Sequence, residues 1–261
     1  MSQLKDQINR TIHLKKTPKR IISLVPSQTE LLCDLGLESS IVGVTKFCVH
    51  PNQIRSNVTV VGGTKQIHLE KVKSLKPDII LCNKEENTKE IVEACESICS
   101  VHVSDIFTLL DSLKLIKQYG IIFNKEKAAE LICKSIEIEN AKFKNFIKNK
   151  ERLKVIYFIW KKPLMVAGRD TFINHLLGLN NFDNIYQKEH RYPIVTSIEE
   201  KEVDLVLLSS EPFPFNAKHQ KEFKKFYPNA KIVLVDGEMF SWFGSRLTKA
   251  FQYFKQLRLN L

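Results

Sequence analysis

The sequence lacks the short motifs that mark several common enzyme families. It contains no G-x-S-x-G, H-E-x-x-H, P-loop or G-x-G-x-x-G pattern, which would indicate a hydrolase, a zinc peptidase or a nucleotide-binding enzyme. The nearest approach is Gly62-Gly63-Thr64-Lys65, but Thr64 stands where the glycine before the lysine belongs and no Ser or Thr follows Lys65. None of these enzyme families is therefore indicated by its motif.

Long apolar runs are also missing. No stretch approaches the roughly 18 consecutive apolar residues of a membrane span, so we expect no membrane-spanning segment. Residues 1–10 are polar and lack the apolar core of about 7–15 residues that a secretory signal peptide carries. From this we expect a cytoplasmic protein if the sequence is complete, and a periplasmic one if a leader has been removed.

Paired cysteines and clustered histidines are scarce. The six cysteines include no C-x-x-C pair, and in a cytosolic chain we expect them to be reduced thiols. Cys95 and Cys99 lie four residues apart on a predicted helix with His102 close by. This spacing is compatible with a metal site but more typical of a packed helix face, because no fourth ligand is in view. The three histidines and a carboxylate of zinc or manganese receptors are not found, so no metal site is predicted.

The net charge of +11 favours anionic partners such as acidic small molecules, membrane headgroups or nucleic acid. Most lysines, however, are scattered along predicted helices rather than grouped with aromatic residues. The densest group, at residues 142–154, is interpreted as a solvated helix end. We therefore expect no nucleic-acid partner.

Strand and helix signals alternate along the first half of the chain. Ser27 is predicted to cap a helix, because Glu30 follows three residues later, and Gly36 suits the end of that helix. Short connections between alternating elements predict a mostly parallel sheet covered by helices. The predicted strands are 20–25, 41–45, 58–64 and 78–82, and the predicted helices are 28–36, 69–75 and 89–99.

The pattern changes at about residue 111 and then restarts. A helix is predicted over residues 124–151, which hold no Gly or Pro, and at about 1.5 Å per residue it is long enough to link two lobes. Strands at 154–160, 164–167, 203–208 and 231–236, with helices at 171–177 and 247–259, repeat the first half. The predicted fold class is α/β: two Rossmann-like lobes with mostly parallel sheets, joined by one long helix, with a ligand cleft between the lobes. The predicted divisions are an extension (1–17), a first lobe (18–122), the linking helix (123–151) and a second lobe (152–261).

Several segments, taken in order, match a known family. They are residues 20–30, the strand 41–45 with His50-Pro51 after it, 61–63 before 69–72, Leu75-Lys76-Pro77-Asp78, 166–168 with 171–174, and 242–246. Together they span roughly residues 18 to 255. This chain resembles the substrate-binding proteins with a helical backbone that serve ABC importers, and among them the cobalamin-binding and iron–siderophore receptors most.

The resemblance implies a non-enzymatic protein, without a cofactor of its own, that binds a cobalamin-like corrinoid, haem or another ferric chelate. A rigid helix between the lobes implies that they close only slightly on the ligand. Aromatic faces could stack on a flat macrocycle, and guanidinium groups could pair with carboxylates. The ligand-binding residues implied are Pro26, Ser27, Phe47, His50, Thr64, Lys65, Asn83 and Lys84 in the first lobe, and Trp160, Arg169, Phe213, Phe215, Phe240, Trp242 and Arg246 in the second.

Other interpretations of these residues stay open. His50 in a loop suits an axial metal ligand, but a lone loop histidine is more often a surface residue. Phe213 and Phe215 could instead close the base of the second lobe. The run 84–87 could host acid–base chemistry, although a solvated or ligand-contacting loop is favoured.

The resemblance also implies partners. Family importers dock on their permease through a surface glutamate of each lobe, and Glu70 and Glu199 match those positions. We expect a monomer. The alternative function is a cytosolic interaction or sensor module that binds a protein segment or another anionic ligand, and a corrinoid-modifying enzyme is a more distant alternative.

Overall fold

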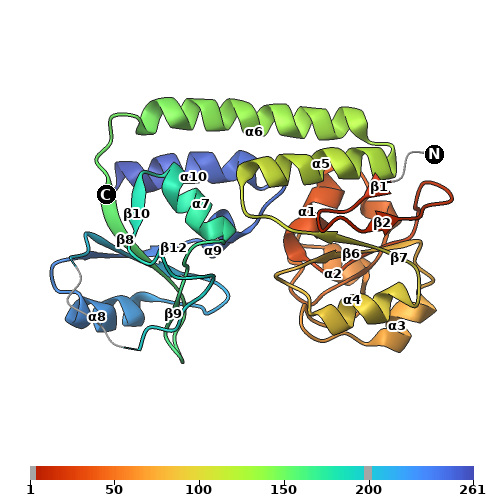
Figure 1. The fold of residues 1–261 in the computed structure, drawn as a ribbon, viewed down its shortest axis with the longest axis horizontal. Helices are drawn as coiled ribbons and strands as arrows, with labels where there is room; N and C mark the ends of the chain where they lie inside the picture. Colours follow the sequence, from red (N-terminus) through yellow and green to blue (C-terminus); the bar gives the residue numbers. More distant parts are fainter. Residues whose placement is uncertain (1–3, 197–201) are drawn as a thin grey trace. The chain divides into compact units, whose positions relative to one another are not determined.

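The computed structural model describes residues 4–196 and 202–261 (Figure 1). The chain divides into two compact units. Unit 1 comprises Met1–Ile106, Leu110–Ile136 and Phe243–Arg246, and unit 2 comprises Phe107–Leu109, Glu137–Trp242 and Leu247–Leu261. Each unit has its own sheet and core, which agrees with the two α/β lobes predicted from the sequence.

Unit 1 is built on a five-stranded sheet in which every neighbouring pair is parallel. The strand order is β5-β4-β3-β6-β7. Each strand is short and rich in Ile and Val, which suits strands buried on both faces. The strands are β3 (Ile21–Ser23), β4 (Ile41–Val44), β5 (Thr59–Val60), β6 (Ile79–Asn83) and β7 (Ser100–Ser104).

Helices cover both faces of this sheet, and successive strand residues alternate between them. Ile80 and Cys82 pack with Val72 of α3 (Leu69–Ser74) and Cys95 of α4 (Lys89–Glu96). The opposite face meets α1 (Pro26–Asp34) and α5 (Leu109–Phe123), and Figure 1 shows α5 and α3 on opposite sides of the strands. Two shorter helices, η1 (Glu38–Ser40) and α2 (Ile54–Asn57), lie in the connections.

The first helix begins differently from the prediction. Its N-cap is Val25, which offers no side-chain hydrogen bond, and Pro26 opens the helix. Ser27 is buried within the first turn, so the predicted capping box of Ser27 with Glu30 is wrong. Proline suits this position because it has a fixed φ and no N–H to satisfy. Gly36 takes the positive φ of 73° expected just after a helix end.

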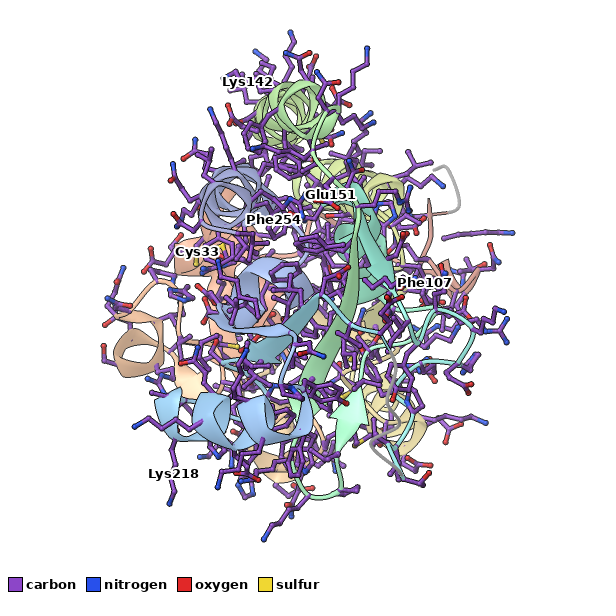
Figure 2. The ribbon with its side chains drawn as sticks, turned by 90° about the vertical axis from the view of Figure 1, so that its left-hand side faces the viewer. Cys33, Phe107, Lys142, Glu151, Lys218 and Phe254 are labelled. Atoms are coloured by element: carbon purple, nitrogen blue, oxygen red, sulfur yellow. The ribbon has the colours of Figure 1, made fainter. Side chains whose placement is uncertain are left out.

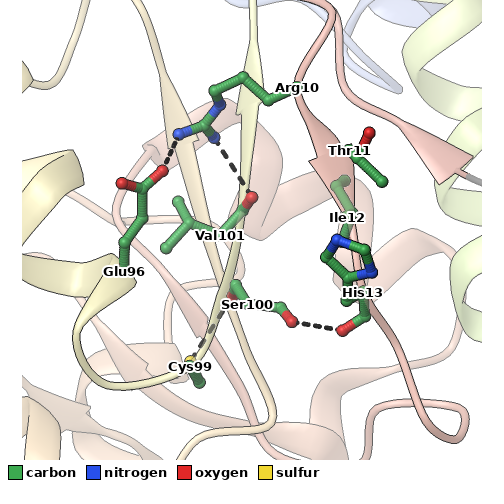
Figure 3. Close-up of a pocket in the computed structure, with 8 residues that line it drawn as sticks. All are labelled: Arg10, Thr11, Ile12, His13, Glu96, Cys99, Ser100 and Val101. Atoms are coloured by element: carbon green, nitrogen blue, oxygen red, sulfur yellow. Dashed lines mark hydrogen bonds and ion pairs between the residues drawn. The ribbon is translucent and has the colours of Figure 1, made fainter.

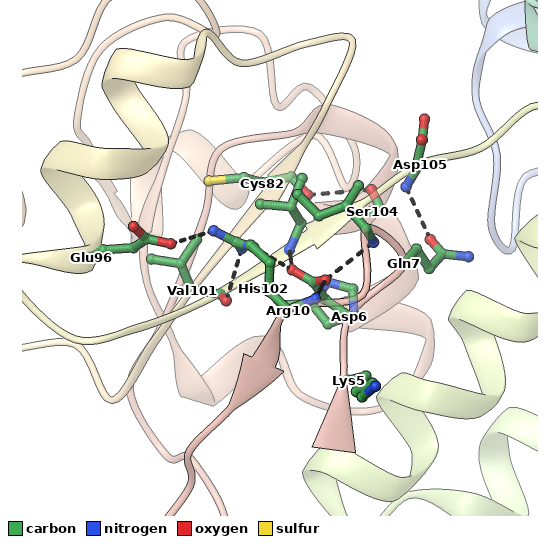
Figure 4. A network of polar contacts seen from close by, with 12 residues as sticks. Lys5, Asp6, Gln7, Arg10, Cys82, Glu96, Val101, His102, Ser104 and Asp105 are labelled. Carbon is green, nitrogen blue, oxygen red and sulfur yellow. Dashed lines mark hydrogen bonds and ion pairs between the residues drawn. The ribbon is translucent and has the colours of Figure 1, made fainter. Parts of the chain in front are cut away.

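A hairpin near the N-terminus covers the edge strand β7. It pairs β1 (Leu4–Lys5) with β2 (Thr11–Ile12), where the sequence had predicted only an extension. The buried carboxylate of Asp6 accepts hydrogen bonds from the backbone N–H groups of Arg10 (2.8 Å) and Val103 (3.2 Å), as Figure 4 shows. An edge strand that is covered in this way cannot pair with another chain.

Unit 2 is built on a second, mostly parallel sheet of order β10-β8-β11-β12, with β9 antiparallel on β8. Figure 2 shows Lys218 of α8 pointing outward and Phe254 of α10 lying among other side chains. The strands are β8 (Leu153–Trp160), β9 (Met165–Val166), β10 (Phe182–Asn184), β11 (Leu205–Ser209) and β12 (Lys231–Val235). The helices are α7 (Phe172–Leu179), α8 (Ala217–Phe226), α9 (Gly237–Ser241) and α10 (Leu247–Leu259).

Aromatic rings fill both faces of the second sheet. On one face Phe158 meets Phe223 of α8, with ring centroids 4.7 Å apart. On the other, Phe240 of α9 meets Tyr157 at 5.2 Å and Phe254 at 4.8 Å.

The long helix predicted from the sequence is α6 (Glu126–Ile147), which contributes residues to both units. Within the described residues, no helix combines the length and the apolar character needed to cross a membrane.

Candidate functional site

The loops that follow the strands of unit 1 gather at one edge of its sheet, because parallel strands all end at the same edge. Two of these loops are joined by hydrogen bonds. Lys65 donates to the carbonyl of Glu85 (2.6 Å), and the Asn87 amide donates to the carbonyl of Thr64 (2.9 Å). Thr64 is half-buried and Lys65 is exposed. The structure thus brings together predicted site residues from the connections after β5 and β6.

Asn83, at the end of β6, forms buried hydrogen bonds that hold the loop after this strand. Its side-chain amide donates to the backbone carbonyl and the hydroxyl of Ser104, and its oxygen accepts from the N–H groups of Glu85 and Glu86. Asn83 is 3% exposed, and these four bonds use the capacity of its side chain. It therefore holds the loop in place and offers a ligand no free group, unlike the direct contact that the resemblance implied.

Phe47 is the prominent apolar side chain at this edge. It follows β4, is 49% exposed, and lies 5.0 Å from the ammonium of Lys46. Beneath it, the buried Cys48 thiol contacts the hydroxyls of Thr29 (3.1 Å) and Thr45 (3.3 Å). The loop is therefore anchored while the ring faces outward. An exposed aromatic ring on an anchored loop is suited to stacking on a ligand.

The other predicted residues of unit 1 are less available. Pro26 and Ser27 are buried in the first turn of α1, so their side chains have no surface to offer. His50 is half-buried next to the cis peptide bond to Pro51. Lys84 is exposed and pairs with Asp105 at 2.7 Å.

In unit 2, aromatic side chains cluster where β8 and β11 end. Trp160, the last residue of β8, is 37% exposed and meets Phe213 edge-on at 5.8 Å. Phe213 is half-buried and meets Phe215 at 4.7 Å and His219 at 5.4 Å. Phe215 is only 6% exposed and belongs to the core. Of the three predicted residues, Trp160 and Phe213 therefore present surface, whereas Phe215 supports them from below.

Phe240 and Trp242 occupy different surroundings from those expected. Phe240 is fully buried between Tyr157 and Phe254. Trp242 is 7% exposed and donates its indole N–H to Glu211 at 2.8 Å. Burial raises the pKa of this carboxyl group. The structure therefore corrects the expectation that these two rings stack on a ligand: both are core side chains.

The two predicted arginines differ from each other. Arg246 is 5% exposed and forms a bidentate pair with Glu30, at 2.7 and 2.9 Å, within unit 1. Its guanidinium is a structural group rather than the ligand contact of the second lobe that was expected. Arg169 is exposed, 3.7 Å from Asp170. It follows β9, which runs antiparallel to β8, so it does not lie directly at the carboxyl end of a parallel strand.

A cavity of about 260 Å³ lies elsewhere, against the N-terminal hairpin (Figure 3). Two polar contacts cross its lining: Arg10 pairs with Glu96, and the Ser100 hydroxyl donates to the carbonyl of His13 (2.6 Å). Burial raises the pKa of the Cys99 thiol in its wall to about 12, so this thiol is unreactive at neutral pH. The cavity has no feature that would select a ligand.

The structure also answers the question of a metal site at Cys95, Cys99 and His102. Cys95 packs in the core on one face of the sheet, whereas His102 points to the other face, against Tyr119 and Gln118. Over residues 4–196 and 202–261, no three His, Cys, Asp or Glu side chains are grouped so that they could hold a metal ion. The packed helix face favoured from the sequence is confirmed for Cys95.

Of the two predicted docking glutamates, Glu70 lies on α3 with its side chain 85% exposed, 2.8 Å from Lys73. Glu199 lies outside the described residues.

His219, which was not among the predicted site residues, lies beside the aromatic cluster of unit 2. Its position three residues after Asn216, a predictable helix cap, was the available signal.

Two parallel α/β units, each with a loop-lined carboxyl edge, define the class of two-lobed solute-binding proteins. The chain belongs to the periplasmic binding protein family, which it matches over residues 21–233. It is 30% identical over 189 residues to an uncharacterised ABC transporter substrate-binding lipoprotein, YvrC, of Bacillus subtilis, a match covering 69% of this chain and 59% of that protein. These findings confirm the resemblance noted in the sequence.

Two further comparisons agree. A vitamin B12-binding protein of Pectobacterium atrosepticum is 26% identical over 176 residues, covering 65% of this chain and 62% of that protein. The crystal structure of the periplasmic vitamin B12-binding protein BtuF of Vibrio cholerae has a TM-score of 0.80 at 19% identity, covering 94% of this chain and 99% of the other. The matches span about three fifths of the length of these two curated relatives. The structural comparison shows the fold alone.

Proposed function

We propose that this protein is a non-enzymatic receptor that binds a cobalamin-like corrinoid or a metal chelate such as haem or a ferric siderophore. The observation that carries this proposal is the pair of exposed aromatic side chains, Phe47 and Trp160, each following a parallel strand of its unit. Ligands of parallel α/β sheets bind beyond the carboxyl ends of the strands, which is where these two rings lie.

The chemistry around these rings suits a flat, anionic or polar ligand. Lys46 lies 5.0 Å from the Phe47 ring in unit 1, and Lys161 and Lys162 follow Trp160 in unit 2. A ring face stacks on a planar macrocycle, and nearby ammonium groups stabilise carboxylates at its rim. The vitamin B12-binding relative supports a corrinoid as the first ligand to test.

The test is calorimetric titration with cyanocobalamin, haemin and a ferric catecholate chelate, with tryptophan fluorescence in parallel. We expect one of them to bind, and Trp160→Ala to weaken it by about 1–3 kcal/mol. Phe226→Ala is the matched control, because Phe226 is 44% exposed in unit 2 but lies at the far end of α8. Equal binding by wild type and Trp160→Ala would remove Trp160 from the site.

Binding of none of the three probes would reject the proposed ligand class. A peptide library should then be screened, since a protein segment is the alternative ligand that the sequence left open. Saturable conversion of a bound corrinoid, followed by its absorption spectrum, would instead indicate an enzyme.

As part of the same proposal, Glu70 docks the loaded receptor on an ABC permease. Its carboxylate is exposed on α3 and could meet a cationic group of a partner. Glu70→Lys should abolish stimulation of a reconstituted permease while leaving the dissociation constant for the ligand unchanged. Glu93→Lys is the control, because Glu93 is also an exposed helical glutamate paired with a lysine. Cell fractionation would test the location, because a cytoplasmic protein could not deliver a ligand to the outer face of an importer.

A further inference from the structure

His219 lies in the first turn of α8, against the aromatic cluster that Trp160, Phe213 and Phe215 form in unit 2. Its ring is 5.4 Å from Phe213 and 5.4 Å from Phe215, and Phe213 in turn contacts Trp160. The loop that carries Phe213 crosses the end of β8, where the N–H of Phe213 donates to the carbonyl of Ile159 (3.3 Å). The imidazole thus contacts the half-buried Phe213 and the buried Phe215, and Phe213 lies between it and the exposed Trp160.

A hydrogen bond from the backbone fixes which ring nitrogen carries the proton. The N–H of Asn216 donates to Nδ1 of His219 at 3.1 Å, within the capping box that starts α8. Nδ1 therefore uses its lone pair, and in the neutral ring the hydrogen must be on Nε2. Nε2 is then a hydrogen-bond donor and has no lone pair available for a metal ion.

The surroundings keep this ring neutral. Burial and the nearby Lys161 lower the pKa of His219, and Lys218 acts in the same direction. Glu222 opposes them, but its carboxylate is paired with Lys161 at 2.7 Å. The aromatic neighbours Phe213 and Phe215 add no charge. At neutral pH the side chain therefore carries one N–H, on a ring that contacts Phe213.

We propose that His219 is a specificity-determining residue of the ligand site, where its Nε2–H donates to an acceptor oxygen at the rim of a ligand that stacks on the Trp160 ring and extends over Phe213. This inference rests on the proposed function and narrows it. The favoured ligands carry a carboxylate or amide carbonyl beside a planar ring system. A metal centre in the ligand takes no bond from His219.

Three variants distinguish the effect of the Nε2–H donor of His219 from the effects of the helix cap and of ring stacking. His219→Phe keeps a flat ring but removes the donor. His219→Gln can keep the cap through its side-chain oxygen but cannot place a donor where Nε2 lies. Asn216→Ala disturbs the cap and leaves the imidazole in place. With haemin or cyanocobalamin, whichever wild type binds, we expect both His219 variants to lose affinity by about tenfold and Asn216→Ala to change it little.

Absorption spectra of the bound probe provide a second readout. The spectrum should be the same for wild type and His219→Phe, because the imidazole does not coordinate the metal. A spectral change on substitution would show ligation and overturn the inference, as would equal affinity of wild type and His219→Phe. If wild type and His219→Phe bind the probe with equal affinity, the proposed receptor function is supported and the proposed role of His219 is rejected. If wild type binds neither probe, the role of His219 is rejected together with the corrinoid and haem ligands.

Discussion

The loops after β6 and β11 occupy the same position in the two units and are built from opposite chemistry. In unit 1, Asn83 is followed by the polar run 84–88, which is held by side-chain hydrogen bonds from Asn83 and Asn87. In unit 2, Ser209 is followed by 210–216, which contains two prolines and two phenylalanines and packs by ring contacts. The same strand–loop–helix topology thus presents a polar loop in unit 1 and an aromatic one in unit 2.

This difference predicts which changes each unit tolerates. A loop held by directed polar bonds loses its shape when one buried donor or acceptor is removed. A loop held by packed rings and prolines depends on side-chain volume and on a restricted backbone. The variants below test this contrast, from the largest expected effect to the smallest.

The largest effect is expected at the buried ion pair of unit 1. Arg246→Met would leave the Glu30 carboxylate buried without its partner, which should lower the free energy of unfolding by about 3–5 kcal/mol. Urea denaturation would measure this. The double variant Glu30→Met/Arg246→Met should recover most of the loss, because neither charge remains buried. A single variant as stable as wild type would show that the pair does not anchor unit 1.

A matched pair of alanine variants compares the two loops directly. Asn83→Ala removes four side-chain hydrogen bonds and should cost about 2–3 kcal/mol. Ser209→Ala removes the bond with Tyr157 and those with Glu211, and should cost about 1 kcal/mol. Equal losses in thermal or urea unfolding would contradict the view that polar bonds hold one loop and packing the other.

Acidification should weaken the core of unit 1 through His102. Burial lowers the pKa of this imidazole to about 4, below the roughly 6.5 of an unfolded chain. The unfolded state therefore binds more protons as the pH falls from about 6.5 to 4, and stability is lost over that range. Between pH 7.5 and 5 the expected loss is about 2 kcal/mol. His102→Gln should reduce this dependence, and unchanged urea curves for wild type over that range would refute it.

The smallest effect on stability is expected at the exposed ring of unit 1. Phe47→Ala should change the free energy of unfolding by no more than about 0.5 kcal/mol, because half of the side chain is already in water. The affinity of the Phe47→Ala protein for the ligand should nevertheless fall, because the variant lacks the exposed ring that could stack on the ligand. A large loss of stability would show that Phe47 belongs to the fold rather than to the site.

Local patterns in the sequence predicted most elements of the fold. The helix α10 (Leu247–Leu259) has the predicted bounds, because its apolar residues recur with helical spacing. The strand β6 begins and ends within one residue of its prediction, because it is a short continuous apolar run. The hairpin of β1 and β2 was missed, since two-residue strands are too short to show a period. The helix α8 was missed because its ten residues hold four lysines and few apolar side chains.

The site was harder to predict because residue type does not separate core from surface. Phe240 and Trp242 are as aromatic as Phe47 and Trp160, yet only tertiary packing buries the first pair. The bond between Arg246 and Glu30 joins residues 216 positions apart, and no local pattern indicates such a pairing. His219 was overlooked because α8 was not predicted, and its contacts with the aromatic rings are evident only in the folded structure.

The short segment Phe243–Arg246 belongs to unit 1, although the chain on both sides of it belongs to unit 2. During synthesis from the N-terminus, Glu30 would be complete and ready to be buried long before the ribosome reaches Arg246. The ion pair between Glu30 and Arg246 therefore cannot form until nearly the whole chain has emerged. A nascent chain stalled before residue 246 should be held in a loosened, protease-sensitive state, whereas one released after it should mature quickly.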